Sequence, residues 1–434
     1  MQFKAVKLIL IFTASIFAFG LAEHRVQGYA SGSPPGASGA PNETNCTVCH
    51  SSFALNSSSG SIAITGLPTT YNVNQQIPIT VTVSYSGRSH FGFQLTALTD
   101  NGAQAGVINI TDSGRTQAFG DYVGSAYRVY VDQTTSGSSS SNGQAQWTFT
   151  WVAPATSTGK VTFYASGVAA NNNGNIDGDY VYTTTASILA VPPPTAIATV
   201  SAASYQPNII SAESIASGFG SNLTTGTGQA VSLPLPTTLA GAVVYIRDSG
   251  NSQRIMPLFY ASPTQVNYLV PIGTATGPAT ISVLNGATTV ATGTVQVANV
   301  APGLFSADAS GQGLAAATVL RIAADGTQTY EPVAIYDQAQ GKFIATPINL
   351  GVDSDQVFLL LFGTGIRGRS SLSAVTALTG GTDAEVLYAG LQGSFVGLDQ
   401  VNLRLPRTLL GRGNIDVQLT VDGVTANVIR IQVK

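Results

Sequence analysis

The feature that most constrains the fold is a series of short segments in which apolar and polar residues alternate. Four of them are residues 77–85 (IPITVTVSY), 92–99 (GFQLTALT), 146–152 (QWTFTWV) and 161–165 (VTFYA), and turn-forming Asp, Asn and Gly residues separate them. Side chains alternate between the two faces of a strand, so each segment can bury one face against a second sheet. The spacing predicts an antiparallel β-sandwich of about seven or eight strands.

The composition favours an all-β protein. Only 9% of the 434 residues are charged, and the chain contains 47 Gly and 20 Pro, a balance that favours short strands and tight turns. The net charge is −3 and no basic run occurs. Nucleic acid is therefore not an expected partner.

Residues 1–22 have the pattern of a secretory signal peptide. Lys4 and Lys7 precede an apolar core at residues 8–21, and Ala22 ends a small-residue cleavage site. An uncleaved membrane anchor is the alternative, although the apolar run is short for a membrane span. No later run resembles a transmembrane helix, so we expect a periplasmic or extracellular protein with no membrane span after cleavage.

Both cysteines of the chain lie in the segment Cys46-Thr-Val-Cys49-His50. Cys-x-x-Cys-His is the attachment signature of c-type haem. Two thiols three positions apart can each form a thioether with a haem vinyl group, and the adjacent imidazole becomes the proximal iron ligand. Cys46, Cys49 and His50 are therefore predicted to hold covalent haem c.

Two other interpretations of this segment remain at this stage. Half of a zinc site would need further ligands, and the chain has no second cysteine pair. A Cys46–Cys49 disulfide would instead make the chain a cofactor-free extracellular adhesion or interaction protein. A thioredoxin-like dithiol is less favoured because it expects a βαβ context.

The sixth iron ligand has two candidates in the sequence. His90 stands at the start of a predicted strand and is a candidate, with a surface histidine as its alternative. Met256 is a second candidate, with a place in the hydrophobic core as its alternative.

Residues 171–179 (NNNGNIDGD) place side-chain oxygens at every second position, as a calcium site would require. The residues concerned are Asn171, Asn173, Asn175, Asp177 and Asp179. The segment lacks the glycine and glutamate of an EF-hand loop, and Asn, Gly and Asp also form plain turns. Calcium is therefore a possible second cofactor and a bare turn is the alternative.

No catalytic constellation is evident, so we do not expect an enzyme. The chain has no G-x-S-x-G nucleophile elbow. The G-x-G-x-x-G at residues 363–368 is not followed by the amphipathic helix that a dinucleotide site needs.

Several ordered motifs resemble one family. The Cys-x-x-Cys-His segment follows Gly39-Ala-Pro-Asn-Glu43, and HFGFQLTAL, WTFTWVAP and VTFYASGVAANNNGNIDGDYVYTT come later. In these stretches residues 30–190 resemble the reeler-like domain of secreted bacterial proteins. The resemblance implies a β-sandwich with a single haem-type motif at its N-terminal edge, and no demonstrated activity. Many relatives have a histidine where this chain has Gln133, so the resemblance does not supply a sixth ligand.

The C-terminal half contains an internal duplication. The stretch 258–271 (LFYASPTQVNYLVP) is echoed by residues 386–406, and each half ends in an alternating strand, at 291–297 and 426–433. These stretches, with SIASGFGSNL and VAPGLF, are similar to the uncharacterised C-terminal domain of large secreted acidobacterial proteins. That resemblance implies an architecture and an extracytoplasmic setting, and no reaction.

The sequence thus predicts a reeler-like β-sandwich followed by two tandem immunoglobulin-like β-sandwiches. The expected segments are a signal peptide (1–22), a Gly/Pro-rich leader with the haem motif (23–59), a reeler-like sandwich (60–190), a Pro-rich linker (191–196) and two immunoglobulin-like repeats (197–300 and 301–434). Within the leader, residues 23–45 are expected to be extended. The expected function is single-haem electron transfer to an unknown redox partner protein. The C-terminal domains would act as spacers or bind a cell-surface or extracellular partner. Haem-based sensing or ligand binding is a third hypothesis, favoured if the iron has five ligands.

Overall fold

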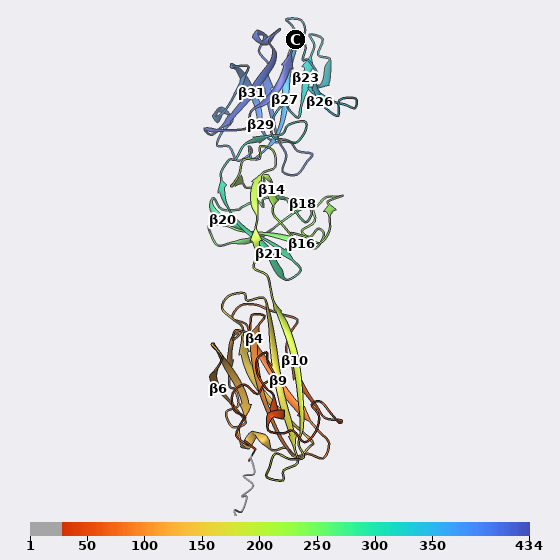
Figure 1. Cartoon of the computed structure of the whole chain (residues 1–434). Coiled ribbons are helices and arrows are strands. Elements are labelled where there is room, and N and C mark those ends of the chain that lie inside the picture. The colour runs from red at the N-terminus through yellow and green to blue at the C-terminus, as the bar shows by residue number, and fades with distance from the viewer. Residues whose placement is uncertain (1–27) are drawn as a thin grey trace, which may run out of the picture. The chain divides into compact units, whose positions relative to one another are not determined.

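The computed structural model describes residues 28–434, so the predicted signal peptide (1–22) lies outside the described residues. The described chain is built from strands, with four short 3₁₀ helices, which confirms the all-β prediction. It divides into two compact units, with the boundary in the sequence between Pro192 and Pro193 (Figure 1). Within residues 28–434 no helix has the length and apolar character needed to cross a membrane. The 3₁₀ helices are η1 (Cys46–Val48), η2 (Ser136–Ser138), η3 (Leu372–Ala374) and η4 (Arg407–Leu409).

The N-terminal unit is a sandwich of two mainly antiparallel sheets. The smaller sheet has the order β1 (Ser61–Thr65), β3 (Gln76–Ser84), β8 (Gln144–Val152) and β5 (Val107–Asn109). The larger sheet has the order β2 (Thr70–Tyr71), β10 (Tyr180–Ala190), β9 (Lys160–Ala170), β4 (His90–Thr99), β7 (Ala126–Gln133) and β6 (Thr116–Val123). The four alternating segments of the sequence correspond to β3, β4, β8 and β9. Figure 1 shows β4, β9 and β10 running together through this unit.

The core of this sandwich is aromatic. Trp147 and Trp151 on β8 are fully buried between the sheets, where Trp147 stacks on Phe93 and Trp151 meets Phe163 edge to face. Both indole N–H groups donate to backbone carbonyls, at 3.0 and 2.8 Å, so burial leaves no unpaired donor. Because Phe93 faces this core, its neighbour Gln94 faces the outer side of the larger sheet.

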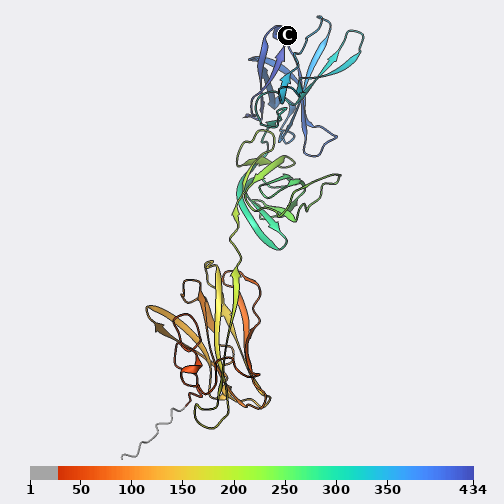
Figure 2. The ribbon, with the colours of Figure 1, turned by 45° about the vertical axis from the view of Figure 1, so that its right-hand side comes forward.

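Residues 23–45 of the leader were expected to be extended, but the described part of that stretch, residues 28–45, turns back on itself through hydrogen bonds such as Gly39 N–H to the Thr44 carbonyl. Residues 28–59 fold against the outer face of the larger sheet, and Figure 2 shows this red segment beside the strands of the N-terminal unit. The Cys46 N–H donates to Ser166 Oγ on β9 (3.1 Å), and the Asn56 N–H donates to the Val181 carbonyl on β10 (2.9 Å). Side-chain and backbone acceptors on the larger sheet thus satisfy N–H groups that a Gly/Pro-rich segment would otherwise expose to water.

The C-terminal unit begins with two sheets of short strands. The first contains β11 (Thr195–Ala196), β13 (Ile209–Ser211), β16 (Ala242–Arg247), β17 (Gln253–Met256), β20 (Gly277–Asn285) and β21 (Thr288–Ala298). The second contains β12 (Ala198–Ser201), β14 (Ile215–Phe219), β15 (Gly228–Gln229), β18 (Leu258–Ala261) and β19 (Gln265–Leu269). Met256 is fully buried in the hydrophobic cluster between them, the core position that was its alternative.

The rest of this unit is a ten-stranded sheet and a separate hairpin, β25 (Ala334–Asp337) with β26 (Lys342–Ala345). The large sheet contains β22 (Gly303–Leu304), β23 (Ala317–Ile322), β24 (Gln328–Pro332), β27 (Gln356–Thr364), β28 (Val375–Thr379), β29 (Thr382–Leu391), β30 (Asp399–Arg404), β31 (Gly413–Val421), β32 (Val424–Thr425) and β33 (Ile429–Val433). Its buried apolar residues form a cluster of their own, distinct from that of residues 197–297.

The duplicated stretches form the same local structure. The β18–β19 pair has a register shift between Leu258 and Tyr260, and β29–β30 has one between Val386 and Tyr388. In each pair a glutamine amide donates to the asparagine two residues on, at 2.8 Å, in Gln265–Asn267 and Gln400–Asn402. The repeated sequence thus encodes a bulged strand pair.

Candidate functional site

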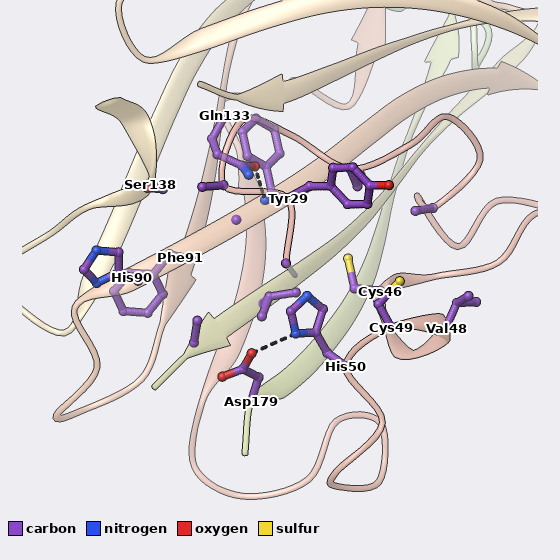
Figure 3. Close-up of a pocket in the computed structure, with 18 of the residues that line it drawn as sticks. Tyr29, Cys46, Val48, Cys49, His50, His90, Phe91, Gln133, Ser138 and Asp179 are labelled. Carbon is purple, nitrogen blue, oxygen red and sulfur yellow. Dashed lines mark hydrogen bonds and ion pairs between the residues drawn. The ribbon is translucent and has the colours of Figure 1, made fainter. Parts of the chain in front are cut away.

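The Cys-x-x-Cys-His segment forms one tight turn at the edge of the N-terminal sandwich. Asn45 caps η1, because its side-chain oxygen accepts the Thr47 N–H (2.9 Å). The Cys46 carbonyl accepts the N–H of His50 (3.0 Å), which closes the turn. Both cysteines are free thiols, Cys46 buried and Cys49 half-buried, and both border the same cavity as the imidazole (Figure 3).

Asp179 orients the imidazole of His50. Its Oδ2 lies 2.8 Å from His50 Nδ1, and its Oδ1 accepts the Asn171 N–H at 2.8 Å. The carboxylate is 1% exposed and acts as an acceptor in both contacts, so Nδ1 of His50 carries the proton. The other ring nitrogen, Nε2, then has a free lone pair, and Figure 3 shows it pointing away from Asp179 into the cavity. A carboxylate behind a histidine is the usual outer partner of a metal ligand.

The cavity has a volume of about 340 Å³ and lies between η1, residues 28–37, the ends of β4 and β7, and the loop after β9. Its walls are mainly apolar, with Tyr29, Phe91, Phe93 and Val168 among them. The volume is at the lower end of the range for ligand pockets, about 300–1,000 Å³. Burial raises the pKa of the Cys46 thiol to about 12, so this sulfur is protonated at neutral pH.

These residues fit a covalent haem. Two thiols on one turn, an imidazole with a free and oriented Nε2, and apolar walls are the donor set that haem c requires. Within the described part of the chain, residues 28–434, no lysine or arginine lines the cavity. A bare metal ion fits less well, because residues 28–434 contain no group of three or more His, Cys, Asp or Glu that could hold one.

His90 borders the same cavity as His50, at its rim. Its Nδ1 lies 3.2 Å from Ser89 Oγ and its Nε2 lies 3.5 Å from Ser139 Oγ. It also borders a neighbouring surface depression. The structure therefore brings the two histidines to one cavity and places a hydroxyl group near each ring nitrogen of His90. The role of His90 as sixth iron ligand stays a prediction.

The proposed calcium ligands lie in a loop that lines the cavity. The side-chain oxygens of Asn171, Asn173 and Asn175 each accept a backbone N–H two residues further on, at 2.8–3.1 Å. This is a series of Asx turns, the geometry expected of a plain turn. Asp179 contacts His50 through Oδ2 and the Asn171 N–H of the loop through Oδ1. The calcium site, including Asp177, stays a prediction.

Residues 28–37 form one wall of the cavity. The sequence analysis did not identify the two buried residues that hold this segment in place, Gln94 and Asp132. The Ser33 N–H donates to Asp132 Oδ2 (2.7 Å), and the Ala37 N–H donates to Gln94 Oε1 (2.6 Å). Gln94 and Asp132 are directly opposite each other on β4 and β7, and both are fully buried. No local pattern marks them, because a polar residue at an outward strand position normally faces water.

Asp132 should make the stability of the N-terminal unit depend on pH. Burial raises the pKa of its carboxyl from 3.8 to about 8, and its Oδ1 has no hydrogen-bond partner within residues 28–434. Between these two values the folded state holds a proton that the unfolded state has lost, so stability falls as pH rises, by up to about 1.4 kcal/mol per unit. Urea unfolding at a series of pH values measures this slope.

The variant Asp132→Asn should remove this pH dependence and unfold at a higher urea concentration than the unmodified protein at pH 8. The exposed Asp121→Asn on the neighbouring β6 serves as the control and should keep the original slope. An unchanged slope in Asp132→Asn would show that this carboxyl ionises normally in the folded protein.

The N-terminal region contains a Reeler domain, since that family model matches residues 44–173. Among solved structures, the chain is similar to the Reelin-N domain of F-spondin, with 18% identity, a TM-score of 0.24, and coverage of 34% of this chain and 97% of that one. It is also similar to the human F-spondin reeler domain, with 20% identity, a TM-score of 0.23, and coverage of 32% and 95%. A cohesin module from a Clostridium perfringens family 33 glycoside hydrolase matches at 9% identity and a TM-score of 0.24, covering 30% and 96%. No curated protein matches the chain.

Proposed function

We propose that the N-terminal unit carries one covalent haem c and transfers single electrons outside the cytoplasm. Cys46 and Cys49 would form the two thioethers, and His50 Nε2 would ligate the iron. The observation that carries the proposal is the hydrogen bond from His50 Nδ1 to the buried Asp179, because it leaves Nε2 free beside both thiols. The predicted signal peptide agrees with it, since c-type haem is attached outside the cytoplasmic membrane.

The residues around the site have separate tasks in this proposal. When bound, haem c supplies a one-electron couple between ferric and ferrous iron. Asp179 fixes the tautomer and the orientation of His50, and raises the basicity of Nε2. Val168, which packs against Cys46, helps to keep water from the cavity and so lowers the local dielectric. No substrate cleft is needed, which agrees with the lack of a catalytic constellation in the sequence.

The C-terminal unit would act as a spacer or as a module for a cell-surface or extracellular partner. It contains no cysteine and no histidine, so none of the predicted haem ligands belongs to it apart from Met256, which is buried. The redox chemistry is therefore assigned to the N-terminal unit alone.

The proposed function is tested by a redox titration of the full chain, produced in a host that assembles c-type cytochromes. We expect one reversible couple that follows a one-electron Nernst curve in the visible spectrum. The alternative, an interaction protein with a Cys46–Cys49 disulfide, gives a protein with no visible absorption and two half-cystines. That result would contradict electron transfer.

Replacing Asp179 by asparagine should raise the midpoint potential by on the order of 60 mV. The neutral amide is a weaker acceptor for the Nδ1 proton than the carboxylate, so Nε2 becomes a weaker electron donor to the iron. Ferric iron depends on this donation more than ferrous iron does, and it therefore loses more stabilisation. A tenfold change in relative affinity corresponds to about 59 mV for one electron. Asp177→Asn, an exposed position in the same loop, is the matched control and should leave the potential unchanged. Equal potentials for both variants would remove Asp179 from the proposed site.

A further inference from the structure

Gln133 is the last residue of β7 and borders the cavity, although it is only 4% exposed. The strands β4 and β7 pair only at Gln94–Asp132 and Leu95–Val131. At the next position the backbone ladder is broken, and the side-chain oxygen of Gln133 accepts the Phe93 N–H at 2.8 Å. The side chain thus takes the place of a backbone carbonyl at the end of the strand pair.

This bond fixes the orientation of the amide. An N–H can donate only to the oxygen, so Oε1 must face Phe93 and Nε2 must lie on the other side. Within residues 28–434 Nε2 forms no hydrogen bond, and Gln133 borders the cavity, so this donor is available to a ligand there. Gly92 leaves room for this group, because a Cβ there would lie 3.0 Å from Nε2.

Figure 3 shows Gln133 and His50 on opposite sides of the cavity. An iron held by His50 would therefore present its other face toward the Gln133 amide. Among residues 28–434, no lysine or arginine borders the cavity to attract an anion.

We propose that Gln133 donates a hydrogen bond to a small neutral diatomic ligand bound on the side of the iron opposite His50. The inference rests on the proposed haem attachment and adds a ligand-binding site to it. Donors and steric access on this side decide whether a haem binds gases or only passes electrons. His90 would then remain at the rim of the cavity beside Ser89 and Ser139. His50 would be the one protein ligand of the iron, in addition to the porphyrin nitrogens.

Carbon monoxide is the probe for this site. We expect the reduced full-length protein to bind CO, and its C–O stretching band should move to higher wavenumber in Gln133→Leu, where the donor is lost. The Kd for CO should rise by up to about fivefold, the loss of one hydrogen bond. Gln133→Glu, measured where the new carboxyl is ionised, keeps an acceptor for the Phe93 N–H and should shift the band in the same direction.

Gln146→Leu, an exposed position on β8, is the control and should leave the band unmoved. A band that is the same in the unmodified protein and in both Gln133 variants overturns the proposal. So does a reduced protein that binds CO only after His90→Ala, because His90 then occupies the position. These results leave covalent haem in place, whereas a protein with no covalent haem removes this proposal and the proposed function together.

Discussion

Replacing Cys46 and Cys49 together by alanine should give a folded protein that holds no haem after denaturation. Thioethers are the only bonds in the proposed site that survive unfolding, so haem should stay with the unmodified chain and leave the double variant. The fold should persist, because Cys46 packs only in a small cluster with Val168 and Val181. We expect a loss of about 1 kcal/mol in stability. Absorption of the acid-extracted chain measures the effect.

The single variants sharpen this test. Cys46→Ala and Cys49→Ala should each keep covalent haem through one remaining thioether, at reduced yield. Val48→Ala, in the same turn at an exposed position, is the control and should match the unmodified protein. Covalent haem in the double variant would mean that other side chains attach it and would contradict the assignment.

Replacing Arg128 by alanine should lower the free energy of unfolding of the N-terminal unit by about 3–5 kcal/mol. Arg128 on β7 pairs with Glu43 of the leader, and both side chains are almost wholly buried. Arg128 also donates to the Pro41 carbonyl (3.0 Å), and the Tyr130 hydroxyl donates to Glu43 (2.7 Å). Without the guanidinium, the Glu43 carboxylate is left buried without a counter-charge, which is costly.

The leader should separate from the sheet in this variant, since Glu43 is three residues before Cys46. Hydrogen exchange of residues 28–59 should therefore speed up, and haem incorporation should fall. Lys160→Ala is the matched control: Lys160 and Asp100 form a pair at 3.0 Å with side chains 45% and 67% exposed. It should change stability by less than about 0.5 kcal/mol. Equal effects of the two variants would show that the Arg128–Glu43 pair does not hold the leader.

The strands of the N-terminal sandwich follow directly from the sequence. In β3 and β8 one face enters the core, so apolar and polar residues alternate, and Trp147 and Trp151 fall on the buried face. Strand β6 was not predicted. It is an edge strand whose side chains are mostly exposed, and therefore its sequence carries little alternation of apolar residues.

The site was predicted only in part. The Cys-x-x-Cys-His turn is local, so its residues could be named from the sequence. The hydrogen bond between His50 and Asp179 joins residues 129 positions apart, and the pattern of residues 171–179 assigned Asp179 to a calcium loop instead. Gln94 and Asp132 act through contacts that form only once the leader lies on the sheet, and Gln133 acts through a contact with Phe93 on the neighbouring strand. Such contacts leave no periodicity in a single sequence.

The measurement that tests the central claim most directly is the intact mass of the purified protein, made in a host that assembles c-type cytochromes and analysed without reductant. The account predicts the mass of the chain plus one haem, with neither Cys46 nor Cys49 open to alkylation. A colourless protein at the mass of the chain less two hydrogens would place a disulfide between the two sulfurs, and that result would contradict it.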